Sequence, residues 1–165
     1  MTNVGSGGGV TKLSSVPKQT AEDEEDFDLG CGDATSPLID EGLYEVGYLR
    51  ASKPFKPFGG EARVLFYFQI LTAGDHAGKE LFMALRVSPR QGRKSLAMSS
   101  KLVRAWSVAA GYTPKRTDRL STTMFKGKAF LCKVETVKYG PRKVPIAPVG
   151  QYSIIRYLTE RTAGG

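Results

Sequence analysis

The sequence predicts an all-β fold with one helix, in the element order β-β-β-α-β-β, preceded by a disordered acidic arm. From Leu43 onward, apolar and polar residues alternate in five separate segments, which is the two-residue period of a half-buried strand. Between the third and the fourth of these segments, the period changes to that of an amphipathic helix. The chain has 165 residues, which is enough for one domain with a core and one tail.

The first 40 residues form the predicted arm. Residues 5–9 have the composition of a flexible linker, and the segment 22–28 (EDEEDFD) has too little apolar surface to fold alone. Residues 1–41 carry a net charge of −7, whereas the remainder of the chain carries +15. We therefore expect a folded domain over residues 41–160, with residues 161–165 as a C-terminal tail.

The five alternating segments do not all indicate a β-strand equally strongly. The one over residues 62–71 is the strongest, because it is dense in aromatic and β-branched residues. The glycine-bounded turn after it predicts a hairpin with the next strand. Residues 73–79 also resemble a phosphate-binding Walker loop, but Ala73 replaces its first glycine and a strand follows instead of a helix, so a hairpin turn is preferred. The predicted strands are residues 43–50, 62–71, 79–87, 128–139 and 151–158.

A single helix is predicted over residues 101–110. Ser99 or Ser100 can cap its N-terminus, and Gly111 stands where a left-handed residue commonly ends a helix. The apolar residues follow a helical spacing that places Trp106 on the buried face.

This order of elements matches the OB-fold, a five-stranded Greek-key barrel whose helix lies between the third and fourth strands. Other small β-barrels and α+β folds can use the same elements. The OB-fold is informative because it binds oligonucleotides on the face of its second and third strands, beside the loops that join strands one to two and four to five.

Alternation along the second and third strands separates core residues from outward residues. Val64, Phe66, Phe68 and Ile70 fall on one face, and Leu81, Met83, Leu85 and Val87 are their counterparts on the next strand. The opposite face displays aromatic rings that can stack on bases and guanidinium groups that can hold phosphates. The alternative is that the arm or a neighbouring subunit covers these rings. The outward candidates are Arg63, Tyr67, Phe82 and Arg86.

Both loops that an OB-fold uses for binding contain basic residues beside aromatic ones. Lysines and arginines supply phosphate contacts, and a phenylalanine or tyrosine can clamp a base. Alternatively, one phenylalanine of the first loop closes the mouth of the barrel. The candidates are Lys53, Phe55, Lys56 and Phe58 in the first loop, and Lys138, Tyr139, Arg142 and Lys143 in the loop between the fourth and fifth strands.

The residues give no indication of catalysis, of a metal site or of a cofactor. The single histidine, His76, lies in the predicted turn without a nucleophile at a suggestive spacing, and we expect it to be solvated. Cys31 and Cys132 form no CxxC pair, and Cys132 alternates with apolar residues, so a buried thiol is expected. No signal sequence and no apolar run of about 18 residues is present, so we expect a cytoplasmic protein.

The part of the chain after residue 41, with its net charge of +15, attracts polyanions. Nucleic acid is the commonest polyanion in a cytoplasm. An anionic membrane surface is the competing target, but the sequence contains no amphipathic basic helix to lie on it. The remaining interpretation is that the excess positive charge has no ligand and only keeps the surface of the protein solvated.

Four segments together resemble the small OB-fold single-stranded DNA-binding proteins of phages and bacterial mobile elements. They are EGLYEV at 41–46, FYFQI at 66–70, GKELF at 78–82 and KLVRAWSVAAG at 101–111. The resemblance implies an accessory protein of DNA replication or recombination, and it transfers no catalytic residue. Bacterial members usually carry an acidic tail at the C-terminus, whereas here the acidic segment precedes the fold.

We therefore expect a non-enzymatic protein that binds single-stranded DNA with little sequence preference. The alternative is a protein-interaction or structural module, such as a phage structural protein or an inhibitor, that docks on an acidic partner. RNA as the ligand and a homo-oligomeric state stay open. The acidic segment 22–28 is expected to compete with nucleic acid for the basic groove, and the alternatives are that it only recruits a basic protein partner or only keeps the chain soluble.

Overall fold

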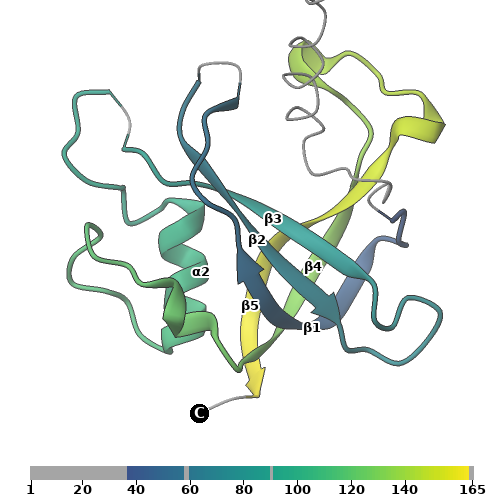
Figure 1. Ribbon diagram of the computed structural model, residues 1–165, viewed down its shortest axis with the longest axis horizontal. Coiled ribbons are helices and arrows are strands. Elements are labelled where there is room, and N and C mark those ends of the chain that lie inside the picture. The colour runs from purple at the N-terminus through teal and green to yellow at the C-terminus, as the bar shows by residue number, and fades with distance from the viewer. Residues whose placement is uncertain (1–36, 58–59, 90, 164–165) are drawn as a thin grey trace, which may run out of the picture. The chain divides into compact units, whose positions relative to one another are not determined.

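A computed structural model describes residues 37–57, 60–89 and 91–163 (Figure 1). The predicted arm up to residue 36, with its acidic segment 22–28 and Cys31, lies outside the described residues, as does Phe58. The described part is mostly β-structure with one α-helix, in the predicted order. The elements are β1 (Gly42–Ala51), β2 (Arg63–Ile70), β3 (Glu80–Arg86), α2 (Lys101–Ala110), η2 (Thr122–Phe125), β4 (Ala129–Val137), η3 (Pro141–Lys143), η4 (Pro148–Gly150) and β5 (Tyr152–Ala163), where η denotes a 3₁₀ helix.

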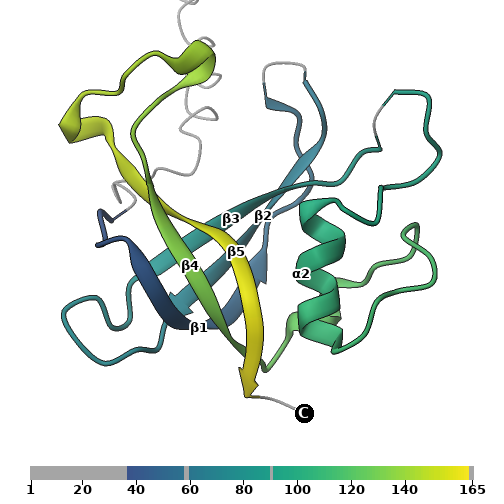
Figure 2. The ribbon, with the colours of Figure 1, turned by 180° about the vertical axis from the view of Figure 1, so that it is seen from behind.

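The five strands form one antiparallel sheet in the order β3-β2-β1-β4-β5. The predicted hairpin of β2 and β3 is confirmed, and its register runs without a break from Arg63 opposite Arg86 to Gln69 opposite Glu80. Register shifts interrupt β1 after Tyr48, and others occur along the pairing of β4 with β5. The sheet is strongly twisted, as Figures 1 and 2 show from opposite sides.

The core lies between the concave face of the sheet and α2. The alternation predicted for β2 and β3 is confirmed, except that Val87 is only half-buried. Phe125 of η2 is also fully buried, although the sequence pattern did not indicate it. Its ring meets Phe66 edge-on at 4.9 Å between centroids, and it also contacts Tyr48 and Phe130. An aromatic cluster therefore joins the sheet to the segment that follows the helix.

The helix has the predicted bounds and caps. The Ser100 hydroxyl accepts a hydrogen bond from the Val103 backbone N–H, and Gly111 ends the helix at a φ of 82°. Trp106 is buried, and its indole N–H donates to the Ser121 carbonyl oxygen at 3.2 Å. The helix packs against β3, β5 and η2. No helix in the described ranges is long and apolar enough to cross a membrane.

The folded unit extends beyond both predicted boundaries. At its start, Ile39 is 1% exposed, because its backbone N–H and carbonyl oxygen both bond to the Ser153 hydroxyl, at 2.8 and 3.0 Å. At its end, β5 continues to Ala163, because β4 still offers pairing partners there. Residues 37–40 of the predicted arm and residues 161–163 of the predicted tail therefore belong to the fold.

Candidate nucleic-acid interface

A row of three aromatic rings runs from β2 over the edge strand β3 to the other edge strand, β5. Tyr67 and Phe82 are direct cross-strand partners on β2 and β3, with ring centroids 6.5 Å apart. Phe82 then stacks on Tyr152, which begins β5, at 6.0 Å and an interplanar angle of 23°. All three rings are half-buried, so each keeps some surface open to solvent. We call Tyr67, Phe82 and Tyr152 the aromatic row.

A β-bulge in β1 brings a cation to one end of this row. The register shift between Tyr48 and Arg50 places Arg50 opposite Tyr67, although strict alternation would turn Arg50 toward the core with Tyr48. The Arg50 guanidinium lies 4.2 Å from the centroid of the Tyr67 ring, which is a cation–π distance. It also donates two hydrogen bonds to Glu80, at 2.9 and 2.6 Å, and these bonds are the main reason that the pKa of Arg50 is raised.

The two predicted arginines lie at the other end of the β2–β3 hairpin. Arg63 and Arg86 are direct partners, an arrangement in which like charges repel. Glu61 relieves this repulsion, because both of its carboxylate oxygens accept hydrogen bonds from Arg86, at 2.9 and 3.0 Å. Arg63 is exposed. With Glu80 on Arg50 and Glu61 on Arg86, the face of the row is only weakly basic.

The first loop folds back along the start of β2. Phe55 and Arg63 exchange two backbone hydrogen bonds, at 2.9 and 2.8 Å, so Phe55 is half-buried beside the hairpin. Lys53 and Lys56 on either side of it are exposed. The described part of the loop therefore presents two cations to solvent and packs its aromatic ring near Arg63.

The loop between β4 and β5 presents all four of its predicted residues to solvent. Tyr139 is 62% exposed, and Lys138, Arg142 and Lys143 are exposed as well. Arg142 and Lys143 have φ values of 61° and 60°, a left-handed conformation that costs of the order of 1–2 kcal/mol for a residue other than glycine. A backbone hydrogen bond from the Gly140 N–H to the Val144 carbonyl oxygen, at 2.8 Å, closes the turn around them.

The structure brings some of the predicted residues together and leaves others apart. Tyr67 lies beside Phe82, and Arg63 lies beside Arg86 and Phe55. The first loop and the β4–β5 loop extend toward the same end of the sheet, at the top of Figures 1 and 2. The β4–β5 loop returns directly into Tyr152, so it begins and ends beside the aromatic row without placing its own side chains on it.

Two members of the site were missed by sequence reasoning. Tyr152 could be assigned to the outer face by alternation. Its contact with Phe82, however, depends on how the two edge strands, β3 and β5, approach each other. Arg50 was missed because a bulge reverses its face, and no residue in β1 marks the bulge in advance. Neither contact has a local sequence signal.

In the turn after β2, the His76 side chain is more buried and makes more contacts than expected. Its side chain is only 21% exposed, so the prediction of a solvated histidine is wrong. The ring packs edge-on against Tyr44, and its nitrogens lie 3.1 Å from the Lys79 ammonium and 3.5 Å from the Asp40 carboxylate. These contacts join the turn to the start of β1.

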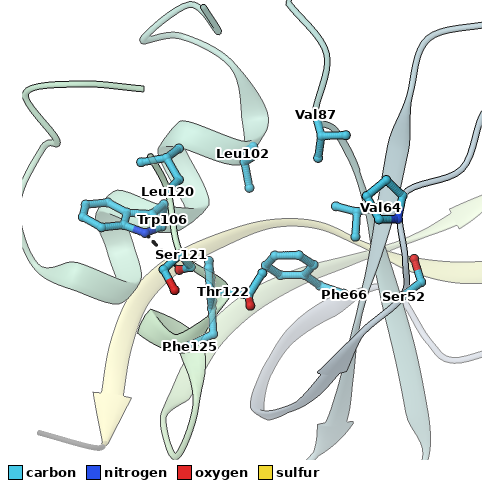
Figure 3. Close-up of a pocket in the computed structure, with 11 residues that line it drawn as sticks. Ser52, Val64, Phe66, Val87, Leu102, Trp106, Leu120, Ser121, Thr122 and Phe125 are labelled. Carbon is cyan, nitrogen blue, oxygen red and sulfur yellow. Dashed lines mark hydrogen bonds between the residues drawn. The ribbon is translucent and has the colours of Figure 1, made fainter. Parts of the chain in front are cut away.

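An apolar cavity of about 170 Å³ lies between α2, η2 and the start of β2 (Figure 3). Trp106, Leu102 and Phe66 are among its walls, together with Phe125. No charged side chain is found among the described residues that line it. The cavity is thus an extension of the core beside Trp106, and it offers no group that would hold a phosphate.

Cys132 is expected to be chemically inert in the folded protein. Its side chain is fully buried, and this burial raises the pKa of the thiol from about 9 to about 12, which lowers the thiolate fraction at neutral pH by roughly a thousandfold. A chain carrying Cys31→Ser should therefore not react with a disulfide reagent such as DTNB until urea unfolds it. Fast labelling of the folded variant would contradict this placement of Cys132.

No protein-family model matches the chain, and no curated protein has a matching sequence. The functional assignment therefore depends on the aromatic row, on the loops beside it and on the charge of the chain.

Proposed function

We propose that the chain is a non-enzymatic OB-fold protein that binds single-stranded DNA with little sequence preference. The observation that carries this proposal is the aromatic row, with the Arg50 guanidinium at one end of it. Such a protein would serve replication or recombination of a phage or mobile element, as the sequence resemblance implies.

The strand order supports the OB-fold part of the proposal. An OB barrel that is opened between its third and fifth strands has the order 3-2-1-4-5, which is the order of this sheet. These two edge strands are in contact with each other, and the stacked rings of Phe82 and Tyr152 are part of that contact. The helix lies between the third and fourth strands in sequence, where an OB-fold has its helix.

Stacking explains why a single strand is the favoured ligand. Bases of a duplex are already stacked on one another, whereas the bases of a single strand can turn toward a protein ring. Each base–ring contact contributes about 1–3 kcal/mol and discriminates little among the bases. A row of rings across several strands suits successive bases, while the lysines and arginines of the two loops suit the phosphates between them.

Binding of fluorescently labelled oligo-dT, measured by anisotropy at increasing salt, tests the proposal. We expect saturable binding that weakens steeply with salt, with a slope of about −0.7 per neutralised phosphate on a log–log plot. The chain should prefer the single strand to a duplex of the same length.

Polyglutamate of similar length is the matched competitor, because it carries a comparable negative charge without bases. Weak competition by polyglutamate would support stacking as part of recognition. Equal competition, or no binding of oligo-dT at low salt, would contradict the proposal and favour docking on an acidic protein partner.

A further inference from the structure

A second hollow, separate from the aromatic row, lies between α2, β3 and β5. Its volume is about 300 Å³. The two edge strands meet at Phe82 and Tyr152, and this hollow opens farther along β5, where the first turns of α2 fill the gap between them. The described residues that line it are Met83, Ser99, Lys101, Arg104, Ala105, Arg156, Tyr157 and Leu158.

Three cations converge on this hollow. Lys101 and Arg104 come from α2, and Arg156 comes from β5. Lys101 is held inward, because its ammonium donates to the carbonyl oxygen of Ile155 at 3.4 Å. Among the described residues, the carboxylate that acts on Lys101 is Glu135 of β4, which approaches Arg156 at 3.7 Å. The charges around the hollow are therefore positive in excess.

The cations are close enough to affect one another. Burial, and next to it the repulsion from Arg156, lowers the pKa of Lys101 to about 8, while Glu135 acts in the opposite direction. An ordinary lysine titrates near 10.4. The folded protein thus holds this ammonium in a place where its charge is unfavourable, and a bound anion would remove the penalty.

We propose that the hollow formed by Lys101, Arg104 and Arg156 binds a phosphate group. Its direct ligands would be the ammonium of Lys101, which comes from α2, and the guanidinium of Arg156, which comes from β5. Ser99 and Tyr157 add hydroxyl groups to the lining. Three cations with two hydroxyl groups provide the donors that a phosphate oxygen prefers.

The position of the hollow favours a phosphate of a nucleic-acid strand over a free phosphate. Ser99 also lines a neighbouring hollow of about 160 Å³, whose walls include Arg86 and Arg93. Arg86 belongs to the face of the β2–β3 hairpin. Ser99 therefore joins two hollows that lead from the face of the β2–β3 hairpin to Lys101; along this path Glu61 offsets the charge of Arg86, and Arg93 adds a further cation. In this respect the inference rests on the proposed function, whereas binding of the phosphate group itself does not.

Titration of the full chain with inorganic phosphate, followed by NMR of the backbone amides around the hollow, tests the site. We expect saturable shifts, and an affinity lowered roughly tenfold or more in Lys101→Met and in Arg156→Gln. Lys126→Met removes an exposed lysine elsewhere and should bind phosphate like the unchanged chain. Far-UV circular dichroism shows whether each variant is folded, and the exposed Arg156 provides a test even if Lys101→Met unfolds. Unsaturable shifts, or folded variants that both bind phosphate as tightly as the unchanged chain, would overturn the proposal.

The pH dependence of sulfate binding provides a second test of the site. Sulfate keeps its charge between about pH 7 and pH 9, whereas Lys101 loses its proton over that interval. We expect sulfate binding to weaken by about tenfold from the lower to the higher pH, and to be independent of pH in Lys101→Met. A pH-independent affinity of the unchanged chain would show that Lys101 is not a ligand.

Two further experiments are needed. The first distinguishes a phosphate of a DNA strand from free phosphate, and the second tests the phosphate site independently of the proposed function. If a strand phosphate occupies the hollow, Lys101→Met should reduce the salt slope of oligo-dT binding by about 0.7, whereas an unchanged slope indicates a free phosphate as the ligand. A chain carrying Tyr67→Leu and Phe82→Leu should still bind inorganic phosphate. Loss of DNA binding with retained phosphate binding would therefore overturn neither the hollow nor its ligands.

Discussion

A chain carrying both Tyr67→Leu and Phe82→Leu should bind oligo-dT at least about thirtyfold more weakly than the unchanged protein. Leucine keeps an apolar side chain on the sheet but offers no ring for a base to stack on. Each lost stack costs about 1–3 kcal/mol, and 1.4 kcal/mol corresponds to a factor of ten in affinity. Anisotropy titrations at one fixed low salt concentration measure the effect.

Tyr112 provides the matched control for this experiment. It is 59% exposed, but its ring lies against Trp106 beside the helix and not on the aromatic row. Tyr112→Leu should therefore leave oligo-dT affinity unchanged. Thermal unfolding of each variant separates loss of binding from loss of fold. A folded double variant that binds as tightly as the unchanged chain would show that the aromatic row is not the interface.

Trp106→Ala should lower the free energy of unfolding by about 3–5 kcal/mol. The indole is only 6% exposed, and its N–H bonds to the Ser121 carbonyl oxygen. Trp106 already borders the apolar cavity of about 170 Å³, so its removal would enlarge an existing void (Figure 3). The remaining side chains cannot close a space of that size without moving α2. Urea unfolding followed by far-UV circular dichroism measures the change.

Trp106→Phe is the conservative counterpart. It keeps an aromatic ring between α2 and η2 but loses the hydrogen bond to Ser121, so we expect a clearly smaller loss of stability. A loss below about 1 kcal/mol for Trp106→Ala would show that the helix contributes little to the core.

Local signals were sufficient to predict most of the secondary structure. The helix was placed to the residue because a cap at Ser100, a left-handed Gly111 and an amphipathic period all agreed. The faces of β2 and β3 followed from simple alternation, since one side is fully buried. Tyr67 and Phe82 could therefore be placed on the outer face before the structure was known.

What could not be predicted depends on contacts between segments distant in sequence. Phe125 follows a turn without periodicity, and only the packing of η2 beneath the sheet buries it. Ile39 looked like part of the arm, because the hydroxyl that fixes it belongs to Ser153 at the other end of the chain. The register shift in β1, which turns Arg50 outward, likewise has no sequence signature.

The contacts that hold the Arg50 side chain in place affect the entropy of ligand binding. An arginine that is free in solution loses rotamer freedom when a ligand immobilises it, at a cost of about 0.5–1.5 kcal/mol. Arg50 lies between the Tyr67 ring and the Glu80 carboxylate, so folding has already restricted its rotation. A ligand lying on this face therefore meets a planar cation fixed in orientation, and that side chain adds little further ordering cost.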